Sequence, residues 1–227
     1  AVGYFRNFYS NQIEASVELY YKKMDNTIDF KDHAELFLNR HIDGEMRMGK
    51  SMAYGAEFQV KYNFENLNGW VSYTLSKSKR DIPEINDGIA YNSPYDHPND
   101  INIVVNYELN KRWSFSGTWV YASGTPMSLP SGFYMQDNVL QVYYKEGDRN
   151  NARMPAYHRL DLGVTLRNRP KPGRRWESEW TFSIYNAYAR HNSWTVNFVK
   201  DEKNKRIFAE STYLFGFLPA ITYNLKF

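Results

Sequence analysis

The sequence contains no cysteine, no long apolar run and little net charge, and each absence excludes a class of protein. Without cysteine among 227 residues, disulfide frameworks and thiolate metal sites are ruled out. No stretch reaches the roughly 20 apolar residues that a membrane-spanning helix needs. A net charge of +3, from 28 basic and 25 acidic residues, gives no indication of nucleic-acid binding.

Motifs of enzyme active sites are also missing. The five histidines are dispersed without metal-ligand spacing, and there is neither a phosphate-binding glycine loop nor a nucleophile motif of the GxSxG type. His158 and Asp161 flank Arg159 and have the composition of a base with its orienting acid. Alternation instead favours a polar network at the start of a strand, so we expect no catalytic residue and no enzyme activity.

Aromatic residues, by contrast, are abundant. They make up 17% of the chain, with 19 Tyr, 14 Phe and 6 Trp. In outer-membrane barrels such residues collect in girdles at the two membrane interfaces. The composition fits these girdles better than it fits a compact soluble core.

The final stretch, residues 213–227, alternates with a period of two, which indicates a strand with two different faces. One face is entirely apolar or aromatic and consists of Tyr213, Phe215, Phe217, Pro219, Ile221, Tyr223, Leu225 and Phe227. A lipid-facing strand needs such a face, and a strand that closes a barrel pairs on both edges, so that no backbone group faces lipid unpaired. We therefore predict a membrane-embedded terminal strand.

The same alternation recurs earlier and predicts strands over residues 2–9, 13–22, 54–62, 71–76, 101–109, 113–121, 160–167 and 176–188, the last continuing to 198. Long connections (28–50, 81–100, 124–156 and 200–206) alternate with short turns near residues 10, 65, 110 and 171. Outer-membrane barrels combine tight periplasmic turns with long extracellular loops, and their strands cross with about 9–11 residues. The prediction is an all-β, transmembrane antiparallel barrel with Phe227 at its periplasmic end.

The pattern gives about nine strands, whereas single-chain bacterial barrels usually have an even number. We therefore expect residues 1–227 to form the C-terminal portion of a larger barrel domain. No secretory signal peptide precedes the first strand, which is expected of a mature chain or of a piece of a larger one.

Several segments resemble, in order and spacing, the TonB-dependent outer-membrane receptors, and in particular their SusC/RagA-like branch. The resemblance runs through nearly the whole chain, in Ser51–Phe58, Gly69–Lys77, Tyr95–Pro98, Ile101–Tyr107, Ser123–Pro126, Arg153–Leu162, Tyr185–Arg190 and Leu214–Pro219. Residues 153–162 are the most specific match. One departure is Ser193, where relatives often have proline after the asparagine.

The resemblance implies a plugged barrel of about 22 strands, whose plug, N-terminal strands and TonB-coupling segment are not in this chain. It implies active uptake of an oligosaccharide or peptide across the bacterial outer membrane. The implied partners are the TonB complex, a SusD-like surface lipoprotein, outer-membrane lipid and the outer-membrane assembly machinery. Tyr223, Leu225 and Phe227 would form the C-terminal assembly signal.

Polar positions opposite the apolar face are expected to line the barrel lumen. The charged ones are Glu14, Glu18, Glu57, Lys61, Glu108, Arg159, Asp161, Arg167 and Glu179. Confined charges need partners, so we expect ion pairs around a plug, with ligand contact for those near the outer rim.

Two sets of loop residues are candidates for binding. Phe133, Tyr134, Tyr143 and Tyr144 could stack on a sugar or contact a lid protein, although a girdle or packing within the loop would also explain them. Carboxylates between residues 81 and 100 make calcium conceivable, but their spacing matches no EF-hand and solvated loop charge is the simpler explanation; they are Asp81, Glu84, Asp87, Asp96 and Asp100. We expect no other cofactor.

Three alternatives remain open from the sequence. The first is a passive porin or structural barrel without energy coupling. The second is a soluble β-rich binding module, such as a sandwich or solenoid. The third is a siderophore or cobalamin receptor, for which the SusC-like segments would be incidental.

Overall fold

The computed structural model describes residues 1–137, 139–145, 147–169, 176–200 and 207–227. Nine long strands form one antiparallel sheet in the order β1-β2-β3-β4-β6-β7-β12-β13-β16, and β5 (Tyr91–Asn92) pairs with β4 beside this path. Their bounds are β1 Val2–Phe8, β2 Ile13–Phe30, β3 Met46–Asn63, β4 Leu67–Asp81, β6 Asn99–Glu108, β7 Trp113–Ala122, β12 Tyr157–Arg167, β13 Glu177–Tyr185 and β16 Leu218–Lys226. In the described ranges, no helix has the length and apolarity to cross a membrane.

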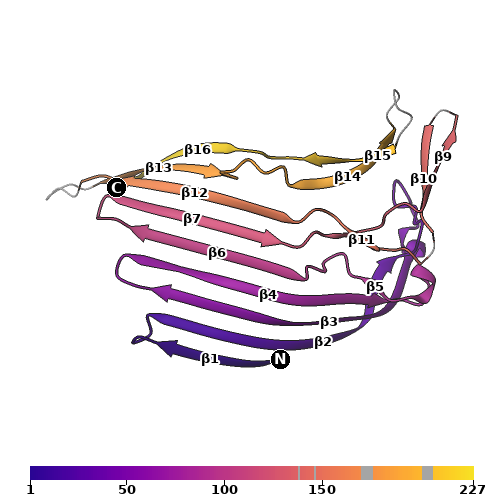
Figure 1. Ribbon diagram of the computed structural model, residues 1–227, viewed down its shortest axis with the longest axis horizontal. Coiled ribbons are helices and arrows are strands. Elements are labelled where there is room, and N and C mark those ends of the chain that lie inside the picture. Colours follow the sequence, from indigo (N-terminus) through magenta and orange to yellow (C-terminus); the bar gives the residue numbers. More distant parts are fainter. Residues whose placement is uncertain (138, 146, 170–175, 201–206) are drawn as a thin grey trace.

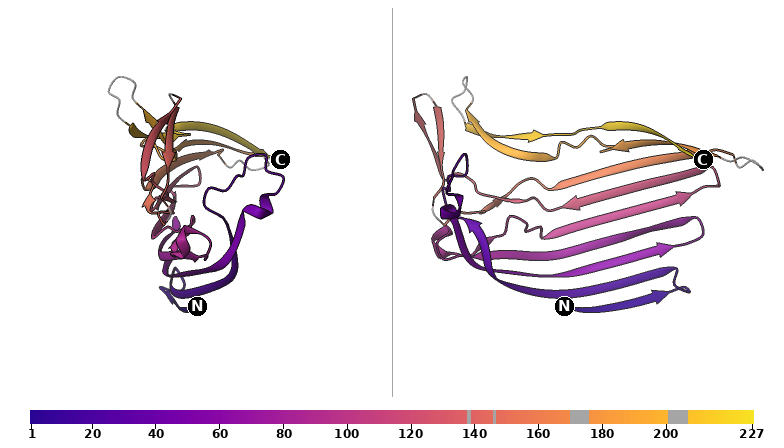
Figure 2. Two further views of the ribbon diagram at one scale, coloured as in Figure 1. Left: turned by 90° about the vertical axis from the view of Figure 1, so that its right-hand side faces the viewer. Right: turned by 180° about the vertical axis from the view of Figure 1, so that it is seen from behind.

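The sheet has the arrangement that the alternation predicts. Short turns join strands at one end, long connections lie at the other, and the sheet curves when it is seen along its length (Figures 1 and 2). The predicted number of strands in the main sheet is confirmed, and so is the alternation of short and long connections as far as the described residues reach. β1 and β16 are the edges, and among the described residues β16 pairs with β13 alone, not on both edges as expected.

The strands β2 and β3 are longer than predicted, with 18 residues each. The prediction of a loop over residues 28–50 is therefore wrong at both ends, since the connection runs only from 31 to 45. The alternation is interrupted because the register shifts between Met24 and Thr27, where Asn26 adopts a positive φ of 57°. An irregularity of this kind hides the outer part of a strand from a period-two search.

The long connections contain short elements that the sequence did not indicate. The first contains η1 (Ile42–Glu45) and the second η2 (Asn86–Gly88) together with β5. The third contains β8 (Pro126–Met127), paired with β11 (Ala152–Arg153), and a hairpin of β9 (Gly132–Gln136) and β10 (Val139–Tyr143).

The last two predicted strands are each divided. β13 stops at Tyr185, and β14 (Ser193–Lys200) pairs with β15 (Ile207–Tyr213) in a separate hairpin. Asn186 and Ala189 have positive φ values, and the Asn186 side chain both donates to and accepts from the Arg190 backbone, which fixes the break. The predicted strand over 213–227 begins only at Leu218, and the predicted connections at 171 and 201–206 lie outside the described residues.

The few buried apolar side chains lie in the long connections and not on the nine long strands. Among the described residues they are Ile82, Ile85 and Tyr91. Both faces of the sheet stay largely uncovered by this chain, so neither is the hydrophobic core of a sandwich.

Candidate functional site

One face of the sheet is largely polar across the long strands from β2 to β16, and we call it the polar face. The cross-strand register carries it from Glu14 and Lys61 on β2 and β3 to Thr118 and Asp161 on β7 and β12. It continues through Thr165, Thr181 and Thr222 on β12, β13 and β16. Directly paired residues share a face, so the polar face is continuous. The opposite face, the apolar face, carries residues such as Val17, Phe58 and Tyr73.

All nine charged residues predicted to line a lumen lie on the polar face, although the structure pairs only some of them. Arg167 lies 3.6 Å from Glu108 and 3.7 Å from Glu179. Glu14 is the cross-strand partner of Lys61, whereas Glu18 faces the like-charged Glu57. Whether these side chains meet a plug stays a prediction.

Arg159 is the centre of a polar network near the loop ends of β12 and β13. Its guanidinium binds Asp161 at 2.9 Å and donates to the hydroxyls of Tyr157 and Tyr185 at 2.8 and 2.7 Å. The neighbouring His158 lies on the apolar face, where its Nδ1 is 2.8 Å from the Tyr188 hydroxyl. His158 and Asp161 therefore cannot act as a base and its orienting acid.

At the loop end, a group of ion pairs joins all three long connections, and we call it the loop cluster. Arg149 binds Asp29 at 3.0 Å and Asp32 at 2.9 Å, so the third connection is held against the end of β2. Asp29 also binds Arg80 at 2.7 Å and accepts a 2.7 Å hydrogen bond from the Tyr91 hydroxyl. The Asp29 side chain is only 9% exposed, and such a charge is stable only when it is paired.

Asp96 is the second centre of the loop cluster, and its side chain is fully buried. Its carboxylate is paired with Arg153, lies 3.3 Å from Lys77 Nζ and accepts a 2.5 Å hydrogen bond from the Ser78 amide. Arg153 also donates to the carbonyl oxygens of Asp96 and Gly124 at 2.7 and 3.1 Å. The start and the end of the third connection are thereby fixed to the second.

The carboxylates considered for calcium do not come together. Within the described ranges no three acidic or histidine side chains are placed to hold a metal ion. Asp96 serves the loop cluster, Glu84 binds Arg47 at 2.6 Å, and Asp100 accepts a hydrogen bond from Asn102. These contacts assign the loop charge to ion pairs and hydrogen bonds.

The four aromatic residues proposed for ligand or lid contact are divided by the β9–β10 hairpin. Phe133 faces one side, where its ring packs 5.7 Å from that of Phe198 on β14. Tyr134 and Tyr143 lie on the other side and are each 51% exposed. Tyr144 follows the hairpin and lines a cavity of about 270 Å³ with Asp32, His33, Asp148 and Arg149. They form no single aromatic platform, and their role in binding stays a prediction.

The residues of the predicted assembly signal lie at the turn end of β16. Tyr223 packs against Trp180 of β13 with 4.7 Å between the ring centroids, and Leu225 shares its face. Phe227 is 97% exposed. Recognition of these residues during assembly stays a prediction.

Electrostatics make the loop cluster sensitive to acid. Burial alone would raise the pKa of Asp29, but the hydrogen bonds from Tyr91 and Arg80 and the charge of Arg149 outweigh it and lower the pKa below its ordinary value of 3.8. Burial and the bond to Asp29 raise the pKa of Tyr91, so this hydroxyl remains a donor at neutral pH. Because the pKa of Asp29 is lower in the folded than in the unfolded state, its ionised carboxylate stabilises the folded state above pH 3.8. This stabilisation is lost as the pH falls below that value and the carboxylate is protonated.

Replacing Asp29 with asparagine is therefore expected to open the loops at pH 5, and the difference from the wild type should shrink as the pH falls below 3.8. The variant loses the charged acceptor of Arg80 and Arg149, whereas in the wild type the same acceptor is protonated in acid. Pepsin digestion of folded protein across this pH range measures the difference. A gap between variant and wild type that persists undiminished at pH 2.5 would show that Asp29 does not act through its charge.

Sequence reasoning missed the loop cluster. Arg149 and Asp29 are 120 positions apart, and no local pattern distinguishes them from other loop charges. The only signal in the sequence was the larger number of charged residues in the second half of the third long connection, residues 124–156.

Comparison with known proteins agrees with this geometry. A family model described as TonB dependent receptor-like, beta-barrel matches residues 2–187. No curated protein matches the sequence significantly. Among solved structures, the chain is similar to the ferric-catecholate import receptor Fiu from E. coli K12, with a TM-score of 0.57 and 13% identity over 99% of this chain. It is also similar to the unliganded ferric citrate transporter FecA, with a TM-score of 0.53 and 16% identity over 95% of this chain. The chain spans 27% and 29% of these two proteins.

Proposed function

Because the chain belongs to the family of TonB-dependent receptor β-barrels, we propose that it forms part of a nutrient importer driven by the TonB complex. The family consists of transporters and not of enzymes, and its barrels lie in the outer membrane. The chain is therefore part of an outer-membrane β-barrel. Import by the whole protein, its substrate and its partners are the proposal.

The continuous polar face carries the proposal. It provides a largely hydrophilic wall along the eight strands from β2 to β16 of the main sheet, while the opposite face offers apolar side chains to lipid. At one end of this wall the loop cluster fixes three long connections in place. We assign this end to the cell exterior, where the loops would capture a ligand and pass it along the polar face.

We further propose that the protein belongs to the SusC/RagA-like branch and takes up an oligosaccharide or a peptide together with a SusD-like lipoprotein. The support is the resemblance of residues 51–58, 153–162 and 185–190. Tyr134 and Tyr143 are exposed on one side of the β9–β10 hairpin, where they would contact the sugar or the lid protein.

Uptake of a ferric complex is the second candidate, because Fiu and FecA are import receptors of that kind by name. At 13% and 16% identity the likeness concerns the fold alone, so we place this candidate second.

Uptake in cells tests the proposal. A strain that lacks the gene is supplied with labelled oligosaccharides, peptides or ferric siderophores, with and without functional TonB. We expect loss of oligosaccharide or peptide uptake, and an equal loss when only TonB is removed. Uptake that persists without TonB would indicate a passive porin, and a defect confined to ferric siderophores would favour the second candidate.

A further inference from the structure

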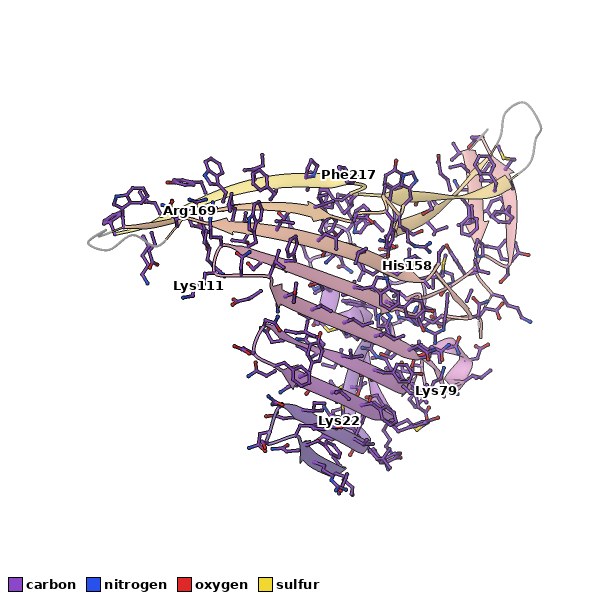
Figure 3. The ribbon with its side chains drawn as sticks, turned by 60° about the vertical axis from the view of Figure 1, so that its left-hand side comes forward. Lys22, Lys79, Lys111, His158, Arg169 and Phe217 are labelled. Carbon is purple, nitrogen blue, oxygen red and sulfur yellow. The ribbon has the colours of Figure 1, made fainter. Side chains whose placement is uncertain are left out.

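We propose that Lys23 and Lys79, on the apolar face of the sheet, form a binding site for the phosphate groups of an outer-leaflet lipid. Both lie toward the loop end of their strands, and Figure 3 labels Lys79 there. The proposal rests on the orientation with loops outside, but it concerns a partner that import itself does not require.

The register places the two lysines side by side. Met52 of β3 is the cross-strand partner of Lys23 on one side and of Lys79 on the other. Paired residues share a face, and their Cα atoms lie about 5 Å apart, so the two lysine Cα atoms are about 10 Å apart. Lysine side chains are long and flexible enough to bring both ammonium groups to one phosphate.

The position of the two lysines along their strands corresponds to the expected boundary of the membrane. Lys23 is the eleventh residue of β2, counted from its start at Ile13, and about 9–11 residues cross a bilayer. One step closer to the turns, Tyr21 and Tyr54 are paired on the same face and are 65% and 45% exposed. Exposed tyrosines mark the interface of a barrel with its membrane, so the lysines would lie at the headgroups.

Lys23 and Lys79 differ from the other lysines near them on this face because no acidic side chain in the described chain is paired with them. Arg6 is also on this face without an ion pair among the described residues, but it lies toward the turn end of β1, where Ala15 is its cross-strand partner. Lys77 is occupied by Asp96, and Lys50 has Asp81 as its cross-strand partner. The cross-strand partners of Lys23 and Lys79 are the neutral Met52 and Asn92, and no ion pair within the described ranges involves either lysine. The nearest carboxylate along β2, Asp25, lies in the register shift between Met24 and Thr27.

A pair of unpaired cations at a membrane surface attracts an anionic partner. Lipid phosphates are the anions at that level, and attraction to an anionic membrane surface contributes about 1 kcal/mol, or about fivefold in affinity, for each lysine. Phosphorylated glycolipid of the outer leaflet is the occupant that fits both the charge and the apolar surroundings.

The test measures lipid binding by the whole receptor, purified in detergent and titrated with lipid A that carries its phosphates or has lost them. We expect the double variant Lys23→Gln, Lys79→Gln to bind the phosphorylated lipid about 25-fold more weakly and the dephosphorylated lipid as the wild type does. Lys22→Gln is the matched control, since Lys22 neighbours Lys23 on the same strand but lies on the polar face. The variant with both lysines changed to arginine should retain binding.

Equal affinity of the double variant and the wild type for phosphorylated lipid A would overturn the proposal, as would an equal loss in Lys22→Gln. Competition by inorganic phosphate at millimolar concentration would show a site for free phosphate, which also contradicts lipid docking. Uptake is measured in the same strains. Lipid binding that is lost while uptake persists supports the site and leaves the proposed import untouched.

Discussion

Replacing Asp96 with alanine is expected to release the long connections from the sheet. The change leaves Arg153 and Lys77 without their shared carboxylate and the Ser78 amide without its acceptor. Loss of one member of a buried ion pair costs about 3–5 kcal/mol, and we expect the lower end because Arg153 and Lys77 are each more than a quarter exposed. Hydrogen exchange of the peptide around Ser78 should then accelerate by about 100-fold, at about 1.4 kcal/mol for each factor of ten.

A matched control is available in the same connection. Glu84 binds Arg47 at 2.6 Å, but its side chain is 71% exposed, and exposed ion pairs contribute little. Glu84→Ala should leave the exchange of the Ser78 peptide within about twofold of the wild type. Equal exchange in the two variants would show that Asp96 does not hold the loops.

Replacing Gly69 with alanine is expected to reduce the amount of folded barrel in the outer membrane. A Cβ atom at this position would lie 2.0 Å from the Val104 carbonyl oxygen and 2.5 Å from the Tyr62 hydroxyl. Tyr62 is the cross-strand partner of Gly69 and donates a 3.1 Å hydrogen bond to the Val104 carbonyl, so its ring covers the glycine. The added methyl group must displace this contact or separate β4 from β6, at a cost of about 1–3 kcal/mol.

Gly117 of β7 is the control for this prediction, because it also lies on the apolar face. A Cβ atom there would meet only Leu162 Cδ2, at an ordinary 3.7 Å. The fraction of folded, heat-modifiable protein in outer-membrane preparations measures both variants. We expect a clear loss for Gly69→Ala and none for Gly117→Ala, and equal amounts would contradict the packing argument.

The two faces of the sheet were predictable because the alternation of apolar and polar residues is visible within each strand, without knowledge of the neighbouring strands. Ile13, Val17 and Leu19 alternate with Glu14 and Glu18, and pairing in the sheet keeps this division from strand to strand. Turn lengths were predictable for a similar reason, since polar residues cluster wherever alternation stops. The family resemblance was carried by local segments of this kind.

Features that depend on distant residues were not predictable. The outer part of β2 was missed because the shift at Met24–Thr27 reverses the alternation in that strand. The outer part of β3 keeps its alternation, but Arg47, Gly49 and Lys50 gave it the composition of a loop. The partnership of Arg149 with Asp29 depends on how two loops fold over the end of the sheet. The aromatic residues of the β9–β10 hairpin were grouped by composition, but strand geometry separates Phe133 from Tyr134.

Cysteine labelling tests the placement of this chain in the membrane most directly, since the sequence has no cysteine of its own. Gln136→Cys lies in the β9–β10 hairpin, and Asn110→Cys lies in the short turn between β6 and β7, at the opposite end of the sheet (Figure 1). A membrane-impermeant maleimide should label Gln136→Cys on intact cells and Asn110→Cys only after the outer membrane is permeabilised. Labelling of Asn110→Cys, but not of Gln136→Cys, on intact cells would contradict the orientation on which capture, import and the lipid site all rest.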